Sequence, residues 1–445
     1  MQRAASKRLP PRYLAAIALL LCVLCATTTS LAAGSTRART SATPLLGGVN
    51  IQGLGAGSTP VDADFEVAQA KALHAKLIRA ELPWSVLEPR GAGKLDPRAL
   101  AYTDRLMNDA AAAGIGVIVL ADSSPCWASA APASIRAKCV PGRGSRAYGY
   151  PPAHAADFAA FARTLVERYP TQLTAFEVWN EPDQANERYF AGPHKPQRYA
   201  ALLAAADTAV KQANPKVTVL AGSLVGSNGV FLKLLYKAGI KGHYDGLAVH
   251  FYTLSLAALR ATHAVQLANG DSTPLWFDEF GWSDCYPRHK IQEEQGCVTA
   301  AVQAQNITNM YRALSSTSYV AAAALYELQD GGGDSFGVIT SHNGHKPSFT
   351  AMSNVLASPF GAVSPVTLSL RKSGGRVLAA GSGPVGDYMR LEAFQGSVLR
   401  YRAALSLDRF NRFKLALPKV LGTHNLRVRV YQQWTGPSKA AQRSI

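Results

Sequence analysis

Eight short apolar segments, each followed by a stretch of helical periodicity, recur between residues 46 and 358. Segments of this kind, bounded by turn-forming residues and alternating with helices, indicate a parallel sheet whose strands are joined by crossover helices. The expected strands are residues 47–51, 77–81, 116–121, 173–179, 217–221, 246–252, 275–278 and 320–326. One (β/α)8 barrel typically takes ~250 residues, so eight units over this length favour a single TIM barrel over two domains. The expected fold class is therefore α/β, with the barrel at residues 46–358.

The sequence pattern changes after residue 358. Short alternating segments are separated by Gly, Pro, Asn and Asp and leave no room for long helices, which is typical of antiparallel strands. The expected strands are residues 366–370, 377–379, 388–394, 398–405, 413–417 and 426–431. We therefore expect a small C-terminal antiparallel β-sandwich at residues 359–445.

Residues 1–33 have the pattern of a secretory signal peptide, in which four basic residues precede an apolar run and small residues follow it. The apolar run is short for a bilayer span, so export is favoured over an uncleaved membrane anchor. Residues 34–45 are rich in Ser, Thr, Arg and Ala and are expected to form a disordered leader. The sequence thus predicts a secreted or cell-envelope protein without a membrane span once the signal is removed.

The cysteines agree with export. Two of the six lie in the expected signal peptide, which leaves Cys126, Cys139, Cys285 and Cys297. Four cysteines allow three connectivities, and an oxidising compartment favours disulfides. We expect the two local pairs, Cys126 with Cys139 and Cys285 with Cys297, each closing a loop after a barrel strand.

No metal or cofactor is expected from the motifs. The cysteines lack the Cys-x-x-Cys spacing of zinc sites, and His342 and His345 lie in a glycine-rich loop with no further ligand evident. The glycines after the first strand approach a dinucleotide-binding pattern, but Ser58 stands where the third glycine is required.

Two of the expected strands end on a carboxylate. The fourth runs into Asn180, Glu181 and Pro182, and the seventh delivers Glu279 into a turn with Gly and Trp. A buried carboxylate is costly unless it is paired, so each is either a satisfied structural group or a functional one. Glycoside hydrolysis requires two such groups, one to protonate the leaving oxygen and one to attack or stabilise the anomeric carbon. The 98 residues from Glu181 to Glu279 correspond to about three strand-helix units of ~31 residues.

A family resemblance rests on the motifs Trp179-Asn180-Glu181-Pro182 and Asp278-Glu279-Phe280-Gly281-Trp282. Together they resemble the clan A retaining glycoside hydrolases, most of all family 39, with family 5 as the next nearest. The resemblance covers roughly residues 47–357. It implies a TIM barrel with Glu181 as acid/base after strand four and Glu279 as nucleophile after strand seven.

The same resemblance points to four substrate-binding candidates near these acids. A His and a Tyr after strand six contact the acid/base and the nucleophile in the clan, which implicates His250 and Tyr252; alternation puts both on one side of the strand. An Arg on strand two keeps the nucleophile ionised, which implicates Arg79, although a surface salt bridge is the alternative for it. The amide of Asn180 is placed to bond the sugar 2-hydroxyl.

Two aromatic residues complete the candidates. Many clan members end strand eight in a Trp beneath the sugar, whereas this chain has Tyr326, so Tyr326 would take that place and the sugar preference stays open. Trp282 offers a further stacking face, although aromatic side chains in a barrel more often belong to the core.

The charge is concentrated at the C-terminal end. Residues 361–445 hold 14 Lys and Arg against 3 Asp and Glu. A basic domain on an exported protein could bind an acidic cell-surface polymer by long-range attraction, while the alternative is that Arg merely occupies the solvent face of each strand. Nucleic-acid binding is not expected, because no motif supports it.

These observations predict a secreted retaining β-glycosidase that hydrolyses O-glycosidic bonds of a polysaccharide or oligosaccharide. The alternative is a non-catalytic polysaccharide-binding envelope protein on the same scaffold. A retaining enzyme requires carboxyl groups about 5 to 5.5 Å apart, whereas about 6.5 to 9.5 Å indicates inversion.

Overall fold

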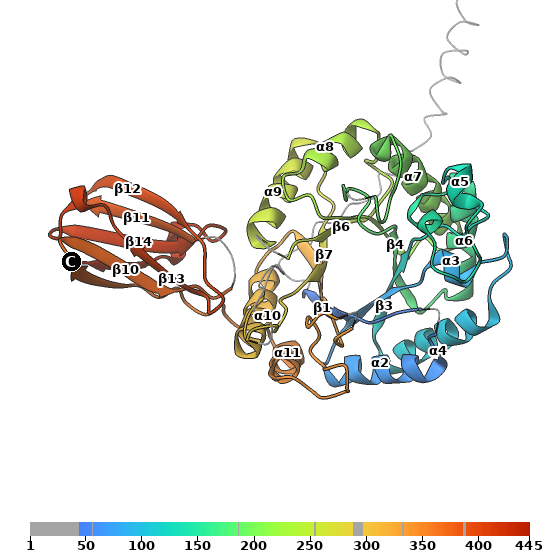
Figure 1. Cartoon of the computed structure of the whole chain (residues 1–445), viewed down its shortest axis with the longest axis horizontal. Coiled ribbons are helices and arrows are strands. Elements are labelled where there is room, and N and C mark those ends of the chain that lie inside the picture. Colours follow the sequence, from blue (N-terminus) through green and yellow to red (C-terminus); the bar gives the residue numbers. More distant parts are fainter. Residues whose placement is uncertain are drawn as a thin grey trace, which may run out of the picture. The chain divides into compact units, whose positions relative to one another are not determined.

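Figure 1 shows the computed structural model, which describes residues 44–55, 57–185, 187–252, 255–287, 297–331, 333–385 and 389–445. The expected signal peptide and nearly all of the expected leader lie outside these ranges. Within them, none of the helices has the length and apolarity needed to cross a membrane.

Eight parallel strands close into a barrel in chain order, and helices surround it (Figure 1). The strands are β1 (Leu46–Asn50), β2 (Leu77–Glu81), β3 (Gly116–Ala121), β4 (Leu173–Val178), β5 (Thr218–Leu224), β6 (Gly246–His250), β7 (Leu275–Phe280) and β8 (Val320–Leu325). The longer helices are α2 (Pro60–Ala72), α4 (Pro97–Ala113), α6 (Ala155–Arg168), α7 (Lys195–Ala213), α8 (Val230–Lys237), α9 (Ser255–Ala268), α10 (Ala300–Ser315) and α11 (Pro347–Ala357). The predicted TIM barrel is therefore confirmed.

The local sequence explains where these elements begin and end. Helix α4 begins with Pro97, whose missing N–H is not needed at a first helical position, and the Asp96 side chain accepts hydrogen bonds from the backbone of the first turn. The helix ends at Gly114, which adopts a left-handed φ of 67° that glycine tolerates without strain. The chain then enters β3 directly.

The barrel interior changes from apolar to charged along the strands. At the lower level, one cluster of buried side chains fills the interior: Leu77, Ile118, Ala175, Leu220, Ala248, Trp276 and Ala322. Side chains two residues further along a strand point to the same side. On β2, β4 and β7 these next residues are Arg79, Glu177 and Asp278. The apolar layer thus supports a polar layer at the carboxyl ends of the strands, which is where TIM-barrel enzymes place their active sites.

Two antiparallel sheets follow the barrel in sequence. One has the order β13 (Arg412–Ala416), β10 (Arg376–Ser382), β9 (Ser369–Ser373), and the other has the order β12 (Val398–Leu405), β11 (Met389–Gln395), β14 (Leu426–Gln432), β15 (Ala441–Ser444). Val377 and Phe413 of the first sheet share a core with Leu391, Val428 and Val430 of the second. The predicted small β-sandwich is confirmed, and β15 is a strand that the sequence analysis did not predict.

Both expected disulfides are present in the structure. Cys126 is bonded to Cys139, with Cα atoms 5.7 Å apart, and Cys285 is bonded to Cys297, with Cα atoms 5.5 Å apart. Cys126 follows β3 and Cys285 follows β7, so each bridge begins in a loop at the carboxyl end of a barrel strand.

Candidate active site

Arg79 lies at the centre of the polar layer, with only 4% of its side chain exposed. Its Nε and Nη2 donate hydrogen bonds of 2.7 and 2.9 Å to the two oxygens of Glu177, and its Nη1 donates one of 2.6 Å to Oε1 of Glu279. Because the guanidinium is a rigid planar fork, Glu177 fixes the direction from which Arg79 meets Glu279. The burial excludes the surface salt bridge that the sequence left open for Arg79.

Glu279 is held in its ionised form by its neighbours. Besides Arg79, the hydroxyl of Tyr252 donates a hydrogen bond of 2.6 Å to Oε2, and Nδ1 of His250 lies 3.3 Å from the same oxygen. Burial opposes ionisation, but His250, Arg79 and Tyr252 together outweigh it and lower the pKa of Glu279 below its usual range. A carboxylate that stays ionised in a buried site is suited to act as a nucleophile.

Glu181 projects from the turn that ends β4. Trp179 and Glu181 have positive φ values of 72° and 44°, a conformation that side chains other than glycine adopt rarely and that is found mainly where function requires it. Oε1 of Glu181 lies 3.1 Å from Nδ1 of His250, and Gln184 donates a hydrogen bond to Oε2. The turn thus directs this carboxylate toward the same imidazole that faces Glu279.

His250 is buried between the acids. Its Nδ1 faces Glu181 and Glu279, and its Nε2 lies 3.5 Å from Oδ1 of Asp278. Burial alone would lower the pKa of His250, but the charge of Glu279, the hydrogen bond with Glu181 and the charge of Asp278 raise it to about 9. At neutral pH the imidazole is therefore a cation within the acidic cluster. For Asp278 itself, burial raises the pKa well above its usual range.

The two candidate catalytic carboxylates face each other closely. One oxygen of Glu181, one oxygen of Glu279 and one ring nitrogen of His250 all lie within 4.8 Å of one another. Glu181 and Glu279 are each about 8% exposed, so both are largely buried.

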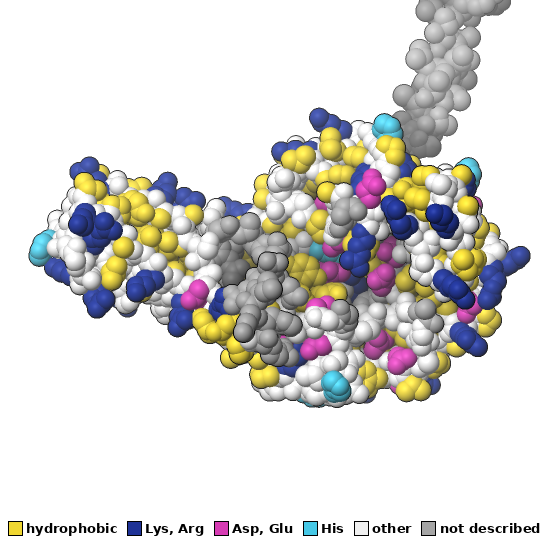
Figure 2. All heavy atoms as spheres, in the orientation of Figure 1, with side chains coloured by type: hydrophobic (Ala, Val, Ile, Leu, Met, Phe, Trp, Pro, Cys, Tyr) yellow, Lys and Arg dark blue, Asp and Glu magenta, His cyan; other side chains and the backbone are white. Residues whose placement is uncertain are grey.

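These carboxylates line a cavity of about 510 Å³ that opens at the carboxyl end of the barrel. The lining residues are Glu81, Asn180, Glu181, Gln184, Arg188, Tyr189, Tyr252, Glu279, Tyr326 and Phe336. Figure 2 shows acidic side chains around the centre of this face of the barrel. A concave, polar site of this size fits one or a few sugar units.

The structure brings together most of the residues singled out from the sequence. Asn180, Glu181, Tyr252, Glu279 and Tyr326 line the cavity, while Arg79 and His250 lie buried against its acids. Trp282 is placed elsewhere. It is 3% exposed, and its ring packs edge-on against Phe280 in the hydrophobic core.

Several residues at the site were not identified from the sequence: Glu81, Glu177, Asp278, Gln184, Arg188, Tyr189 and Phe336. The first three lie on β2, β4 and β7, the strands that carry or lead into Arg79, Glu181 and Glu279. Glu81 follows Arg79 by two residues, so the alternation of β2 could have found it. The others lie in loops, where sequence spacing carries no comparable signal.

Two clusters among the described residues have ligand atoms close enough to hold a metal ion: Glu177, His250 and Asp278, and Glu181, His250 and Glu279. Both share His250. A metal ion there would stand beside the guanidinium of Arg79, which already forms ion pairs with Glu177 and Glu279. The raised pKa of His250 means that its imidazole would have to lose a proton before it could bind a metal.

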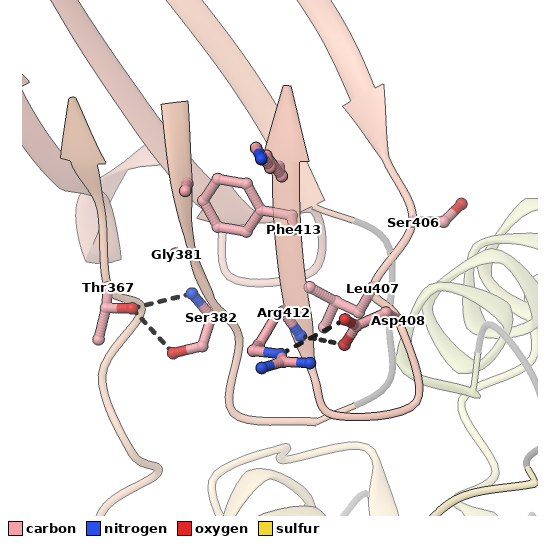
Figure 3. Close-up of a pocket in the computed structure, with 10 residues that line it drawn as sticks. Thr367, Gly381, Ser382, Ser406, Leu407, Asp408, Arg412 and Phe413 are labelled. Atoms are coloured by element: carbon pink, nitrogen blue, oxygen red, sulfur yellow. Dashed lines mark hydrogen bonds and ion pairs between the residues drawn. The ribbon is translucent and has the colours of Figure 1, made fainter. Parts of the chain in front are cut away.

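A larger hollow of about 820 Å³ lies on the β-sandwich (Figure 3). In it, Thr367 is hydrogen-bonded to Ser382, and Arg412 forms an ion pair of 3.4 Å with Asp408. Among the described residues that line it, Asp408 is the only one with a carboxylate, and that carboxylate is paired. Those residues therefore do not supply the two facing carboxyl groups that glycoside hydrolysis needs, so the larger volume does not make this hollow the better candidate.

Two facing carboxylates at the carboxyl ends of β4 and β7 of a TIM barrel are the arrangement that glycoside hydrolysis requires. The family model of cellulase (glycosyl hydrolase family 5) matches residues 47–318, and the chain belongs to this family. No curated protein matches the chain in sequence. Family 5 is one of the two families that the motifs resembled, so the clan is confirmed.

Solved structures of family 39 share the fold. The GH39 enzyme from Xanthomonas axonopodis pv. citri has 14% identity and a TM-score of 0.53, with 92% of this chain and 96% of that one covered. A GH39 β-xylosidase from Caulobacter crescentus has 18% identity and a TM-score of 0.51, with 88% and 97% covered. Bacteroides uniformis β-glucuronidase 2 has 12% identity and a TM-score of 0.49; the match covers 90% of this chain, which spans only 45% of that protein.

Proposed function

We propose that the protein is a secreted retaining β-glycosidase, in which Glu279 is the nucleophile and Glu181 the general acid and then the general base. The observation that carries this proposal is the different environment of two facing carboxylates. Arg79 and Tyr252 each donate a hydrogen bond to one oxygen of Glu279, whereas Glu181 accepts a hydrogen bond from Gln184 and faces His250. Two carboxyl groups with distinct surroundings suit distinct roles.

The closeness of the acids supports retention. Their nearest oxygens lie within 4.8 Å, whereas an inverting enzyme separates its carboxyl groups by about 6.5 to 9.5 Å to admit a water molecule. At the shorter spacing, the second carboxylate reaches the anomeric carbon itself. The intermediate is then a glycosyl ester of Glu279.

The reaction then runs in two displacements. Glu279 attacks the anomeric carbon while Glu181 protonates the departing oxygen, and the glycosidic bond breaks. Glu181, now ionised, removes a proton from water, which attacks the same carbon and releases Glu279. Arg79 and Tyr252 hold the nucleophile in position through both steps.

Asn180 supplies a contact to the reacting sugar. Its Oδ1 accepts a hydrogen bond of 3.2 Å from Nη2 of Arg79, which orients the amide so that its NH2 group remains available to the cavity. That group is placed to donate to the 2-hydroxyl, a contact that strengthens in the oxocarbenium-like transition state.

Three aromatic rings form one wall of the cavity. The ring centres of Tyr252, Tyr326 and Phe336 lie 5.5 to 6.0 Å apart in edge-on pairs. We propose that Tyr326 takes the place in which many clan members have a Trp. Apolar ring faces of this kind pack against the C–H faces of a sugar, and the substrate class we propose is a polysaccharide or oligosaccharide with β-linkages.

Two further parts of the proposal concern location and attachment. The disulfides and the pattern of residues 1–33 favour export. The net charge of residues 361–445 favours attachment to an acidic cell-surface polymer. A non-catalytic polysaccharide-binding protein is disfavoured, because simple binding needs neither a strained turn at Glu181 nor a nucleophile kept ionised.

The test separates the two acids with aryl β-glycosides. Glu279→Ala is expected to abolish turnover of every substrate. Glu181→Ala is expected to retain activity on glycosides with good leaving groups, which need no proton, and to gain activity from azide, which attacks the intermediate without a base. Glu167→Ala, on the exposed face of α6, is the matched control. Near-native activity in both site variants would refute the assignment.

A further inference from the structure

Gln184 lines the cavity, and the double displacement described above gives it no role. Its backbone N–H donates a hydrogen bond of 3.1 Å to the carbonyl of Glu181, and its side-chain amide donates one to Oε2 of the same residue. Glu181 needs such support more than Glu279 does. Glu279 lies within β7, whereas Glu181 lies in a turn beyond the end of β4, and its side chain has several rotatable bonds.

The turn that carries Gln184 is anchored to two other elements. The carboxylate of Asp183 accepts hydrogen bonds of 3.1 and 2.8 Å from the backbone N–H groups of Val225 and Gly226, in the loop after β5. Lys195, the first residue of α7, donates a hydrogen bond of 2.5 Å from Nζ to the backbone carbonyl of Gln184. The backbone beneath the amide is therefore fixed from both sides, so the amide is directed at Glu181 before any substrate binds.

The two neighbours of the Glu181 carboxylate both act as donors. An ionised carboxylate only accepts hydrogen bonds, so Gln184 meets it with its NH2 group. On the other oxygen, Nδ1 of His250 lies 3.1 Å from Oε1, and with a pKa of about 9 this imidazole is a cation whose ring nitrogens both donate. Neither neighbour can accept a proton from Glu181. When Glu181 is a carboxylic acid, its proton is therefore left for the leaving oxygen of the substrate.

Two contacts fix the carboxyl group where one would not. A hydrogen bond to Oε1 alone leaves the group free to rotate about the bond that joins it to the side chain. A second hydrogen bond at Oε2 fixes its plane. Proton transfer needs the two heavy atoms within about 2.6 to 3.2 Å of each other, so a carboxyl group that rotates away from the leaving oxygen transfers its proton more slowly.

Resting on the proposed function, we propose that Gln184 is a positioning residue for Glu181. Its amide fixes the plane of the carboxyl group in both displacements. In the first, the proton of Glu181 passes to the oxygen of the breaking glycosidic bond. In the second, a proton of the attacking water passes to Glu181 while the ester bond to Glu279 breaks. Gln184 itself neither gains nor loses a proton.

This role predicts a kinetic pattern that depends on the leaving group. The first displacement determines kcat/KM, and it needs the proton of Glu181 only when the leaving group is poor. With a good leaving group the second displacement, which needs Glu181 as base, determines kcat. Loss of the amide should then lower kcat and KM together, because the glycosyl ester of Glu279 accumulates, and kcat/KM should stay the same.

The experiment uses the full chain and the 2,4-dinitrophenyl and phenyl β-D-glucopyranosides and β-D-xylopyranosides, whose leaving groups are good and poor respectively. Gln184→Met keeps the length of the side chain and removes the donor. It is expected to lower kcat/KM for the phenyl glycoside about 10- to 100-fold, as for a lost hydrogen bond to a charged group. For the dinitrophenyl glycoside, kcat/KM should stay within about twofold of the wild type while kcat and KM fall together, and azide should restore kcat.

Three further variants isolate the contact. Adding Gln184→Met to Glu181→Ala should change nothing more on the dinitrophenyl glycoside, because the group that the amide positions is already gone. Lys195→Met removes the support of the Gln184 carbonyl and should give the same split to a smaller extent. Gln212→Met is the matched control: this glutamine is exposed on α7 and bonds Arg163, so its kinetics should equal those of the wild type on every probe.

The outcomes separate the inference from the function on which it rests. If the wild type turns over none of the probes, the proposed function fails and the inference falls with it. If the wild type is active but Gln184→Met lowers kcat/KM equally for both leaving groups, or changes neither, the inference is overturned and the glycosidase assignment stands.

Discussion

Tyr252 donates a hydrogen bond of 2.6 Å to Oε2 of Glu279, the carboxylate that Arg79 binds through the other oxygen. Tyr252 lies two residues beyond the end of β6, and Glu279 lies in the neighbouring strand β7. A hydroxyl that donates a hydrogen bond to a carboxylate stabilises its ionised form. The pKa of the nucleophile therefore depends in part on one hydrogen bond that a single substitution removes.

Tyr252→Phe is expected to shift the acid limb of the pH profile upward. Because His250, Arg79 and Tyr252 keep the pKa of Glu279 below its ordinary value, protonation of the nucleophile should reduce wild-type activity only at the acid end of the profile. A hydrogen bond to a charged group is worth about 1.5 to 3 kcal/mol and one pKa unit about 1.4, so the limb should move up by roughly 1 to 2 units. The measurement is kcat/KM across the acidic range.

Tyr236→Phe is the matched control for that profile. Tyr236 also donates a hydrogen bond of 2.6 Å to a carboxylate, that of Asp271, but it does not line the cavity. Its profile should coincide with that of the wild type. An acid limb that does not move in Tyr252→Phe would show that this contact leaves the nucleophile unchanged.

Arg79→Met is expected to destabilise the fold as well as the site. It leaves Glu177, which has no exposed side-chain surface, without its two hydrogen bonds from the guanidinium. Breaking one side of a buried ion pair costs about 3 to 5 kcal/mol of unfolding free energy, measurable by chemical denaturation. Adding Glu177→Gln removes the stranded charge and should recover part of the loss. A double variant whose loss equals the sum of the two single losses would contradict this coupling.

The raised pKa of His250 predicts a pH range over which the stability of the fold changes. Its pKa is about 9 in the folded protein against 6.5 in an unfolded chain, so the protonated imidazole favours folding. This contribution is fully present below pH 6.5 and is lost as the pH rises through about 9. The difference in Tm between the wild type and His250→Asn should therefore shrink across that window. A constant difference in Tm across this range would be evidence against the raised pKa of His250.

The barrel was predictable because its strands are buried on both faces. Apolar and β-branched runs between turn residues gave the bounds of β2 and β3 as observed. β7 was predicted to end at residue 278 and to deliver Glu279 into the turn with Gly and Trp that follows. In the structure the strand continues to Phe280, and Glu279 pairs in register with His250 of β6. Paired strands can thus carry a charged residue where the barrel interior is polar.

The sandwich and the loops were less predictable for related reasons. β9 begins later than expected and extends through Arg371 and Lys372, whose solvent-exposed side chains leave no apolar signal. β15 is short and polar, and it is ordered by its backbone pairing with β14. At the site, Gln184 and Phe336 reach the cavity from loops, whose path depends on tertiary packing and not on local periodicity.

The bridge between Cys126 and Cys139 is expected to contribute to stability. The two cysteines are 13 residues apart. Closing a loop of about 15 residues lowers the entropy of the unfolded chain, which stabilises the folded state by about 3 kcal/mol. The double variant Cys126→Ser, Cys139→Ser should lower the free energy of unfolding by about 2 to 4 kcal/mol. Peptide mapping without reduction should recover Cys126 joined to Cys139 in the wild type, and free thiols at both positions would contradict the bond.

The basic surface of the sandwich is expected to give salt-sensitive binding to acidic polysaccharides. Residues 361–445 carry 14 basic and 3 acidic groups. The exposed basic residues chosen for replacement by Gln are Arg376, Arg400, Lys414 and Lys419. Charges at the surface are screened beyond roughly 8 Å at physiological salt, so binding should weaken as salt rises and should weaken further in the variant.

The matched control for this test replaces four exposed lysines of the barrel by Gln: Lys71, Lys76, Lys94 and Lys216. Both variants lower the net charge by the same amount, so a general charge effect would weaken both equally. If attachment occurs through the sandwich, only the sandwich variant should lose binding at low salt. Both variants should keep wild-type activity on a small aryl glycoside, because none of the eight residues lines the cavity. Equal binding by all three proteins would show that these arginines and lysines only cover the solvent faces of their strands.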